Sequence, residues 1–170
     1  MGTVTAVSDE ALADLIADLT QRGLTVATAE SLTGGGLVAR LVDVPGASHV
    51  VRGGACTYAV DTKSSVLGVS ASQLALTGPV DEQVARQMAR GARELFHADI
   101  GVSTTGVAGP GPADGFPAGT VHIACVHPVG EEHRLLRLDG DRAAVRAGAI
   151  DAAIALVRDV LDFAAVVRGD

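Results

Sequence analysis

A serine at a strand-to-helix turn is the first feature of the sequence that could do chemistry. In the segment 28–35 (TAESLTGG), Ser31 follows a short β-prone stretch, and small residues then open a helix. Backbone N–H groups around Thr33, Gly34 and Gly35 could hold a phosphate or a developing oxyanion, because a helix N-terminus carries partial positive charge. The alternative is structural: a hydroxyl caps the helix and the glycines pack against the sheet.

A lysine and a tyrosine that each occur once in the chain form the second candidate. Lys63 is the only lysine among the 13 basic residues, and Tyr58 is the only tyrosine. An ammonium group can lose its proton where a guanidinium cannot, so Lys63 is a candidate general base. Acting near pH 7 would require a pKa about three units below its usual value, about 4–5 kcal/mol, which burial can supply. The alternative is a surface lysine without a role, beside a half-buried structural tyrosine.

A loop rich in glycine and proline is the third candidate. It follows the hydroxyl-bearing segment Ser103–Thr105, contains Gly106 and Gly109, and continues to Gly119. Its N–H groups could bind an anion, and long loops in compact domains tend to be functional, which favours a substrate loop that begins at Thr105. The alternative is an ordinary hairpin or crossover connection.

The three segments are carried by helices that alternate with strands. Helical spacing and end signals predict helices between Ser8 and Gly23, up to Val42, over Asp61–Leu67, after Asp81, and from about Asp141 to Val167. In the helix after Asp81, the residues expected to face inward are Val84, Met88, Ala92 and Leu95. Strands are predicted over Leu24–Ala29, Gly53–Val60, Ile100–Thr104, Thr120–Val126 and His133–Leu138, the last two as a hairpin. This order predicts an α/β fold, a three-layer α/β/α sandwich with a mixed, mostly parallel sheet.

Each candidate segment follows one of the predicted strands. Ligand sites in α/β sheets gather beyond the carboxyl ends of strands, so parallel strands would bring Ser31, the Tyr58–Lys63 pair and Thr105 to one crevice. A serine nucleophile with a lysine base and a nearby tyrosine can hydrolyse an amide without a metal ion or a histidine. The spacing therefore favours one composite site over three unrelated features.

The composition excludes several classes of protein. A chain of 170 residues is expected to form one domain, over residues 1–170, with a core that needs no disulfide. Only 2% of the residues are aromatic and the net charge is −7, which argues against nucleic acid as a partner. There is no signal-peptide pattern and no run of the ~18 apolar residues that a membrane helix needs, so no membrane association is expected.

Cysteine and histidine usage argues against a metal centre. Cys56 and Cys125 match no redox or metal spacing, and they are expected to be two buried thiols in a reducing cytoplasm. The histidines, among them His122, His127 and His133, suit no helical metal motif. No metal ion is therefore expected.

Six motifs occur together and in order: Thr28–Gly35, Val44–Ser48, Thr57-Tyr58 with Lys63, Thr105–Pro110, Pro117–Val121, and Gly140–Arg142 with Arg146. Through these motifs the chain resembles the C-terminal domain family of the competence/damage-inducible protein CinA, whose members include nicotinamide-nucleotide amidohydrolase. The likeness extends from about Leu12 to Val157. It implies an α/β/α domain that converts nicotinamide mononucleotide to nicotinate mononucleotide and ammonia without a cofactor.

The resemblance also implies roles for individual residues. Ser31 would attack the carboxamide carbon, Lys63 and Tyr58 would manage its proton, and Thr105 would help to position the reacting group. Arg142 or Arg146 would pair with the substrate phosphate; the two lie four residues apart on a helix and face the same way, which leaves the choice open.

The chain departs from the family pattern at two places. Leu32 stands where members commonly have Cys, and Ala59-Val60 where they have Ser-Asn. The second change removes polar groups between Tyr58 and Lys63, which keeps two alternatives open: a non-catalytic nucleotide-binding or regulatory module, and a purely structural interaction domain. The apolar helices are also compatible with a homodimer.

Overall fold

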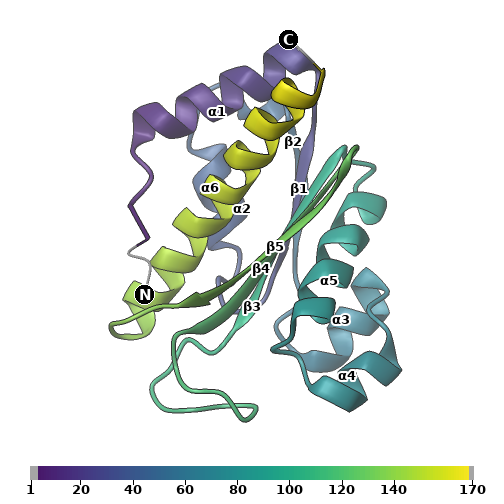
Figure 1. Cartoon of the computed structure of the whole chain (residues 1–170), viewed down its shortest axis with the longest axis vertical. Coiled ribbons are helices and arrows are strands. Elements are labelled where there is room, and N and C mark those ends of the chain that lie inside the picture. The colour runs from purple at the N-terminus through teal and green to yellow at the C-terminus, as the bar shows by residue number, and fades with distance from the viewer. Residues whose placement is uncertain (1–3, 169–170) are drawn as a thin grey trace.

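A five-stranded sheet forms the centre of the molecule (Figure 1). The computed structural model describes residues 4–168. The strands are β1 (Val26–Glu30), β2 (Val51–Cys56), β3 (Ile100–Gly106), β4 (Thr120–His127) and β5 (Gly130–Arg137), and their spatial order is β2-β1-β3-β4-β5. β2, β1 and β3 are parallel, whereas β4 and β5 continue the sheet as an antiparallel hairpin. The predicted mixed α/β sheet is confirmed.

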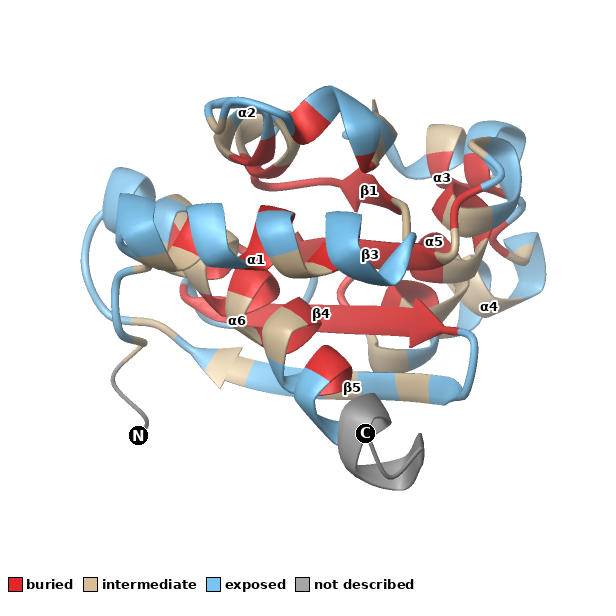
Figure 2. Cartoon of the chain, turned by 90° about the horizontal axis from the view of Figure 1, so that it is seen from above, coloured by how far each residue is buried: buried red, intermediate tan, exposed pale blue. Residues whose placement is uncertain are grey.

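Helices cover both faces of the sheet and complete the three layers (Figure 1). One face carries α1 (Asp9–Arg22), α2 (Gly36–Val42) and α6 (Arg142–Arg168), and the other carries α3 (Val60–Leu67), α4 (Ala71–Thr77) and α5 (Glu82–Leu95). β1, β3 and β4 are buried along nearly their whole length, whereas β5 at one edge is largely exposed (Figure 2). In β2, at the other edge, partly buried side chains alternate with exposed ones. None of the helices described is long and apolar enough to cross a membrane.

The end signals in the sequence form the expected caps. The Ser8 hydroxyl accepts from the Ala11 amide, and Gly23 ends α1 in the left-handed conformation with φ 65°. The Asp81 carboxylate accepts from the first free amides of α5. These local interactions explain why both helices start where the sequence predicts.

The structure differs from the sequence predictions at several strand ends and side chains; β5, for example, begins at Gly130 rather than at His133. The second strand ends at Cys56 rather than Val60, and α4 has no predicted counterpart because none of its residues is buried, which leaves no apolar period to detect. Leu95 is 47% exposed, since it lies in the last turn of α5. Cys56 is exposed and only Cys125 is buried, because β2 is an edge strand whose alternate side chains face solvent.

Candidate active site

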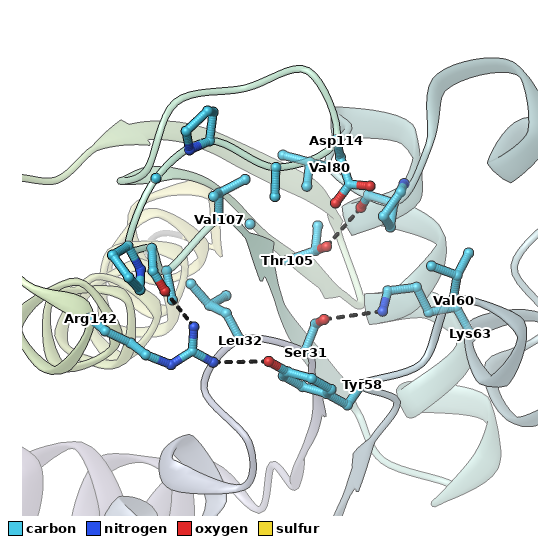
Figure 3. Close-up of a pocket in the computed structure, with 18 residues that line it drawn as sticks. Ser31, Leu32, Tyr58, Val60, Lys63, Val80, Thr105, Val107, Asp114 and Arg142 are labelled. Atoms are coloured by element: carbon cyan, nitrogen blue, oxygen red, sulfur yellow. Dashed lines mark hydrogen bonds between the residues drawn. The ribbon is translucent and has the colours of Figure 1, made fainter.

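A pocket of about 240 Å³ lies beyond the carboxyl ends of the parallel strands. Ser31 directly follows β1, Tyr58 lies just after β2, and the loop that starts at Gly106 follows β3. The predicted site residues that line the pocket are Ser31, Tyr58, Lys63, Thr105, Gly106, Gly109 and Arg142 (Figure 3). The pocket lining does not include Thr33, Gly34, Gly35 or Arg146. The segments after the three parallel strands therefore meet in one crevice, as the strand order predicts.

Lys63 and Ser31 form a buried pair at the base of this pocket. The Lys63 ammonium donates to Ser31 Oγ at 3.1 Å and to the Thr57 carbonyl at 2.6 Å, and the lysine is only 1% exposed. Burial lowers the pKa of Lys63 from its ordinary value, while the nearby Cys56 and Asp114 act in the opposite direction. The shift has the direction that a general base requires.

A buried glutamate shapes the loop that presents Ser31. Glu30 is 1% exposed, and its carboxylate accepts five hydrogen bonds, from the hydroxyls of Thr28 and Thr33 and the amides of Gly35, Leu37 and Val38. A buried carboxylate needs such partners, and the N-terminus of α2 supplies them together with its partial positive charge. The sequence alone did not assign Glu30 this role as a hydrogen-bond acceptor. Its one signal is an acidic residue in an otherwise small and apolar strand.

Contacts within the Ser31 loop occupy backbone amides that the sequence predicts to bind a ligand. The Gly35 amide donates to Glu30 and the Gly34 amide to the Ser31 carbonyl, so both are engaged inside the chain. The Thr33 hydroxyl is likewise taken up by Glu30 and Thr104. Within the part of the chain that the structure describes, the amides of Leu32 and Thr33 donate to no acceptor. Leu32 lines the pocket, whereas Thr33 is fully buried and does not. The Leu32 amide is therefore the N–H group beside Ser31 that a ligand in the pocket can reach.

The two candidate arginines have different partners. Arg146 donates from Nε to the Leu32 carbonyl at 2.9 Å and from Nη2 to the Thr33 carbonyl at 3.0 Å. It therefore stabilises the Ser31 loop without lining the pocket. Arg142 donates to the Gly109 carbonyl at 2.6 Å and to the Tyr58 hydroxyl at 2.9 Å, and it lines the pocket. Of the two, Arg142 is the one that can meet a ligand in this pocket.

Tyr58 and Thr105 line the pocket, and their hydroxyls are hydrogen-bonded to groups other than Ser31. Tyr58 is 60% exposed, and its hydroxyl accepts from Arg142 (Figure 3). The Thr105 hydroxyl donates to the Pro79 carbonyl at 2.7 Å, which leaves its oxygen as an acceptor toward the cavity. The proton of Ser31 is therefore within direct reach of Lys63, and the Tyr58 hydroxyl is paired with Arg142 instead.

Asp114 is a pocket residue that the sequence analysis missed. It lies in the β3–β4 loop, where Asp114-Gly115 is a dipeptide typical of a tight turn. That signal was visible, but nothing in the sequence says which way the turn faces.

Three of the histidines, His122, His127 and His133, lie on the antiparallel strands β4 and β5 and do not line the pocket. His122 Nδ1 and His133 Nε2 are 3.0 Å apart on neighbouring strands, and burial is the main cause that lowers the pKa of both. In the described residues, no group of three or more His, Cys, Asp or Glu side chains is arranged to hold a metal ion.

The fold and the pocket define an α/β/α domain with a buried Ser–Lys pair beyond its parallel strands. Residues 9–161 match the CinA C-terminal domain, and the chain belongs to that family. The resemblance inferred from the motifs is confirmed.

Known proteins support the same assignment. The chain is 48% identical over 143 residues to a CinA-like protein of Frankia casuarinae, covering 84% of this chain and 33% of that protein. The solved structure of the competence/damage inducible protein CihA from Agrobacterium tumefaciens has a TM-score of 0.87 and 36% identity, with 95% of this chain and 99% of that chain covered. A CinA superfamily protein from Escherichia coli gives a TM-score of 0.86 at 32% identity, covering 93% of this chain and 95% of that one. The chain thus spans about a third of the Frankia relative and nearly all of the two solved structures.

Proposed function

We propose that this chain is a serine amidohydrolase that converts nicotinamide mononucleotide to nicotinate mononucleotide and ammonia. The observation that carries the proposal is the contact between Lys63 Nζ and Ser31 Oγ, 3.1 Å apart, in a pocket that has Arg142 in its wall. A buried amine with a lowered pKa beside a serine hydroxyl is an activated nucleophile, and an arginine fork suits a phosphate. The family resemblance supplies the substrate class.

The first half of the reaction forms an ester on Ser31. The Oγ atom attacks the carboxamide carbon while its proton passes to the neutral amine of Lys63. The oxyanion of the tetrahedral intermediate accepts from the amide of Leu32, a pocket residue whose N–H has no other acceptor in the described residues. The C–N bond then breaks, and the proton on Lys63 passes to the leaving nitrogen, so that ammonia departs.

The second half returns the serine. Water attacks the ester carbon and gives up a proton to Lys63 as the second tetrahedral intermediate forms. The bond to Ser31 Oγ breaks, Lys63 returns the proton to that oxygen, and nicotinate mononucleotide leaves. The Thr57 carbonyl holds one N–H of Lys63 throughout, which keeps the nitrogen beside the reacting oxygen.

Ammonia release from nicotinamide mononucleotide tests the proposal. We expect turnover by the purified chain, its loss in Ser31→Ala, and full activity in Ser65→Ala, a control on the exposed side of α3 that does not line the pocket. Absence of ammonia from the wild type between about pH 6 and about pH 9 would contradict the proposal.

One observation favours a second candidate function, a non-catalytic nucleotide-binding module. Val60 lines the pocket beside Lys63, so an apolar side chain stands where the family commonly has a polar one. The same assay separates the two functions, because this module would bind the nucleotide, raise its own Tm by mass action, and release no ammonia.

A further inference from the structure

A tight turn places a carboxylate over the pocket. Ala113 and Phe116 exchange two backbone hydrogen bonds, of 3.0 and 2.9 Å, around the pair Asp114-Gly115. Both central residues have positive φ, 52° and 82°, as a type I′ turn requires, and the Asp-Gly dipeptide accommodates that conformation well. Asp114 is thus held in a defined position, although the loop that carries it is exposed.

The two sides of the pocket carry different charged side chains. Asp114 and Lys63 lie on one side of Ser31, and Arg142 lies on the other, in the view of Figure 3. Arg142 is tied to Gly109 and Tyr58, whereas the Asp114 carboxylate makes no hydrogen bond or ion pair with the described residues. With Lys63 neutral, as a general base must be, Asp114 supplies a negative charge without an ion-pair partner among the described residues, in the lining of the pocket that contains Ser31.

A ligand that matches this arrangement has an anion at one end and a cation near the reacting group. We infer that Asp114 is a specificity-determining residue that selects a carboxamide carried on a cationic, pyridinium-type ring over the same carboxamide on an uncharged ring. The inference rests on the proposed function, under which the carboxamide lies at Ser31 and the phosphate at Arg142. An exposed carboxylate acting across a partly solvated pocket is expected to change affinity about five- to tenfold at low salt, and less at high salt.

The test compares two ligands that differ in ring charge. Nicotinamide mononucleotide has a cationic ring, and its reduced, dihydropyridine form has an uncharged ring with the same carboxamide and phosphate. Binding is measured by calorimetry in Ser31→Ala, which removes turnover, and in the same variant with Asp114→Asn. Asp139→Asn is the matched control, because it removes one exposed carboxylate that does not line the pocket.

We expect the preference for the oxidised nucleotide to fall about five- to tenfold in Asp114→Asn, the range set by the charge interaction, and to stay unchanged in Asp139→Asn. An unchanged preference in Asp114→Asn, or an equal fall in Asp139→Asn, would overturn the inference, as would failure of Ser31→Ala to bind either nucleotide. Ammonia release is measured separately on the wild type. If the wild type releases none while the preference still depends on Asp114, the proposed reaction fails and the role of Asp114 in ligand selection stands.

Discussion

Replacing Lys63 with methionine separates its part in proton transfer from its part in the fold. Methionine has a similar length and suits a buried position, but it has no group that accepts a proton. If Lys63 takes the proton of Ser31, kcat for ammonia release should fall about 10²- to 10⁴-fold, the usual contribution of a general base. The contact of 3.1 Å between Nζ and Oγ is direct, so no bridging group is expected to rescue the variant.

The effect on stability is expected to be much smaller. Losing Nζ leaves the Thr57 carbonyl without the 2.6 Å bond it accepts, and an unpaired buried acceptor costs about 1–3 kcal/mol. Removing an amine that is itself unfavourably buried offsets part of that cost. We therefore expect a net change within about 2 kcal/mol, which for a chain of this length moves Tm by no more than about 8 °C.

The assay is ammonia release from nicotinamide mononucleotide, with a thermal melt of each variant to confirm folding. Lys63→Arg is the matched control, because it keeps the charge and cannot release a proton at neutral pH. A folded Lys63→Met variant that keeps more than a tenth of the wild-type kcat would refute the proton-transfer role. Wild-type rates in Lys63→Arg would show that only positive charge is needed there.

Three further predictions concern pH, the glutamate and the histidines. Because the amine must be neutral to act and burial lowers its pKa, kcat/KM should rise with pH through a midpoint below the ordinary 10.5 of lysine, measured by a pH–rate profile. Glu30→Gln replaces an acceptor of five hydrogen bonds with an amide that repels at least one of its donors, and should destabilise the fold by about 2–5 kcal/mol in urea unfolding. Burial lowers the pKa values of His122 and His133, so the unfolded chain binds protons at a higher pH than the folded chain. The free energy of unfolding should therefore fall as the pH drops from about pH 7 to about pH 5. His133→Gln should make this dependence on pH less steep.

Matched measurements decide each of these. A profile that falls with rising pH below the ordinary lysine pKa would contradict the role of a neutral amine. A loss in Glu30→Gln of under about 1 kcal/mol, the net value of one ordinary hydrogen bond, would mean that the amides of α2 find other acceptors. For the histidines, His49→Gln is the control at an exposed position, and it should leave the pH slope as it is in the wild type.

The sequence predicts which segments come together, because parallel strands end at the same edge of a sheet. Ser31, Tyr58 and Thr105 each lie at or after the end of a strand, the three strands are parallel, and a pocket lies at that edge. Helix ends were equally predictable, because the caps at Ser8 and Asp81 are local interactions between residues two to four positions apart.

The partners of individual polar groups were not predictable, because they depend on long-range packing. The sequence marks the amide of Gly35 as a free anion-binding group, and nothing local says that Glu30 turns back under α2 to occupy it. Cys56 was expected to be buried, yet its exposure follows from the place of β2 at the edge of the sheet. The sequence predicts a strand in this region but does not show that it lies at the edge of the sheet.

The two arginines show how packing separates residues that the sequence cannot distinguish. Arg142 and Arg146 lie one helical turn apart on α6 and face the same way, yet they contact different segments of the chain. Arg146 binds the carbonyls that follow Ser31, while Arg142 joins Gly109 of the β3–β4 loop to Tyr58 beyond β2. A single turn of α6 therefore ties together the segments that follow all three parallel strands. Arg142 uses two of its five N–H donors for Gly109 and Tyr58, so the others remain for a ligand anion. An anion bound there would contact the same side chain that holds the β3–β4 loop, so ligand binding and the position of that loop are coupled through Arg142.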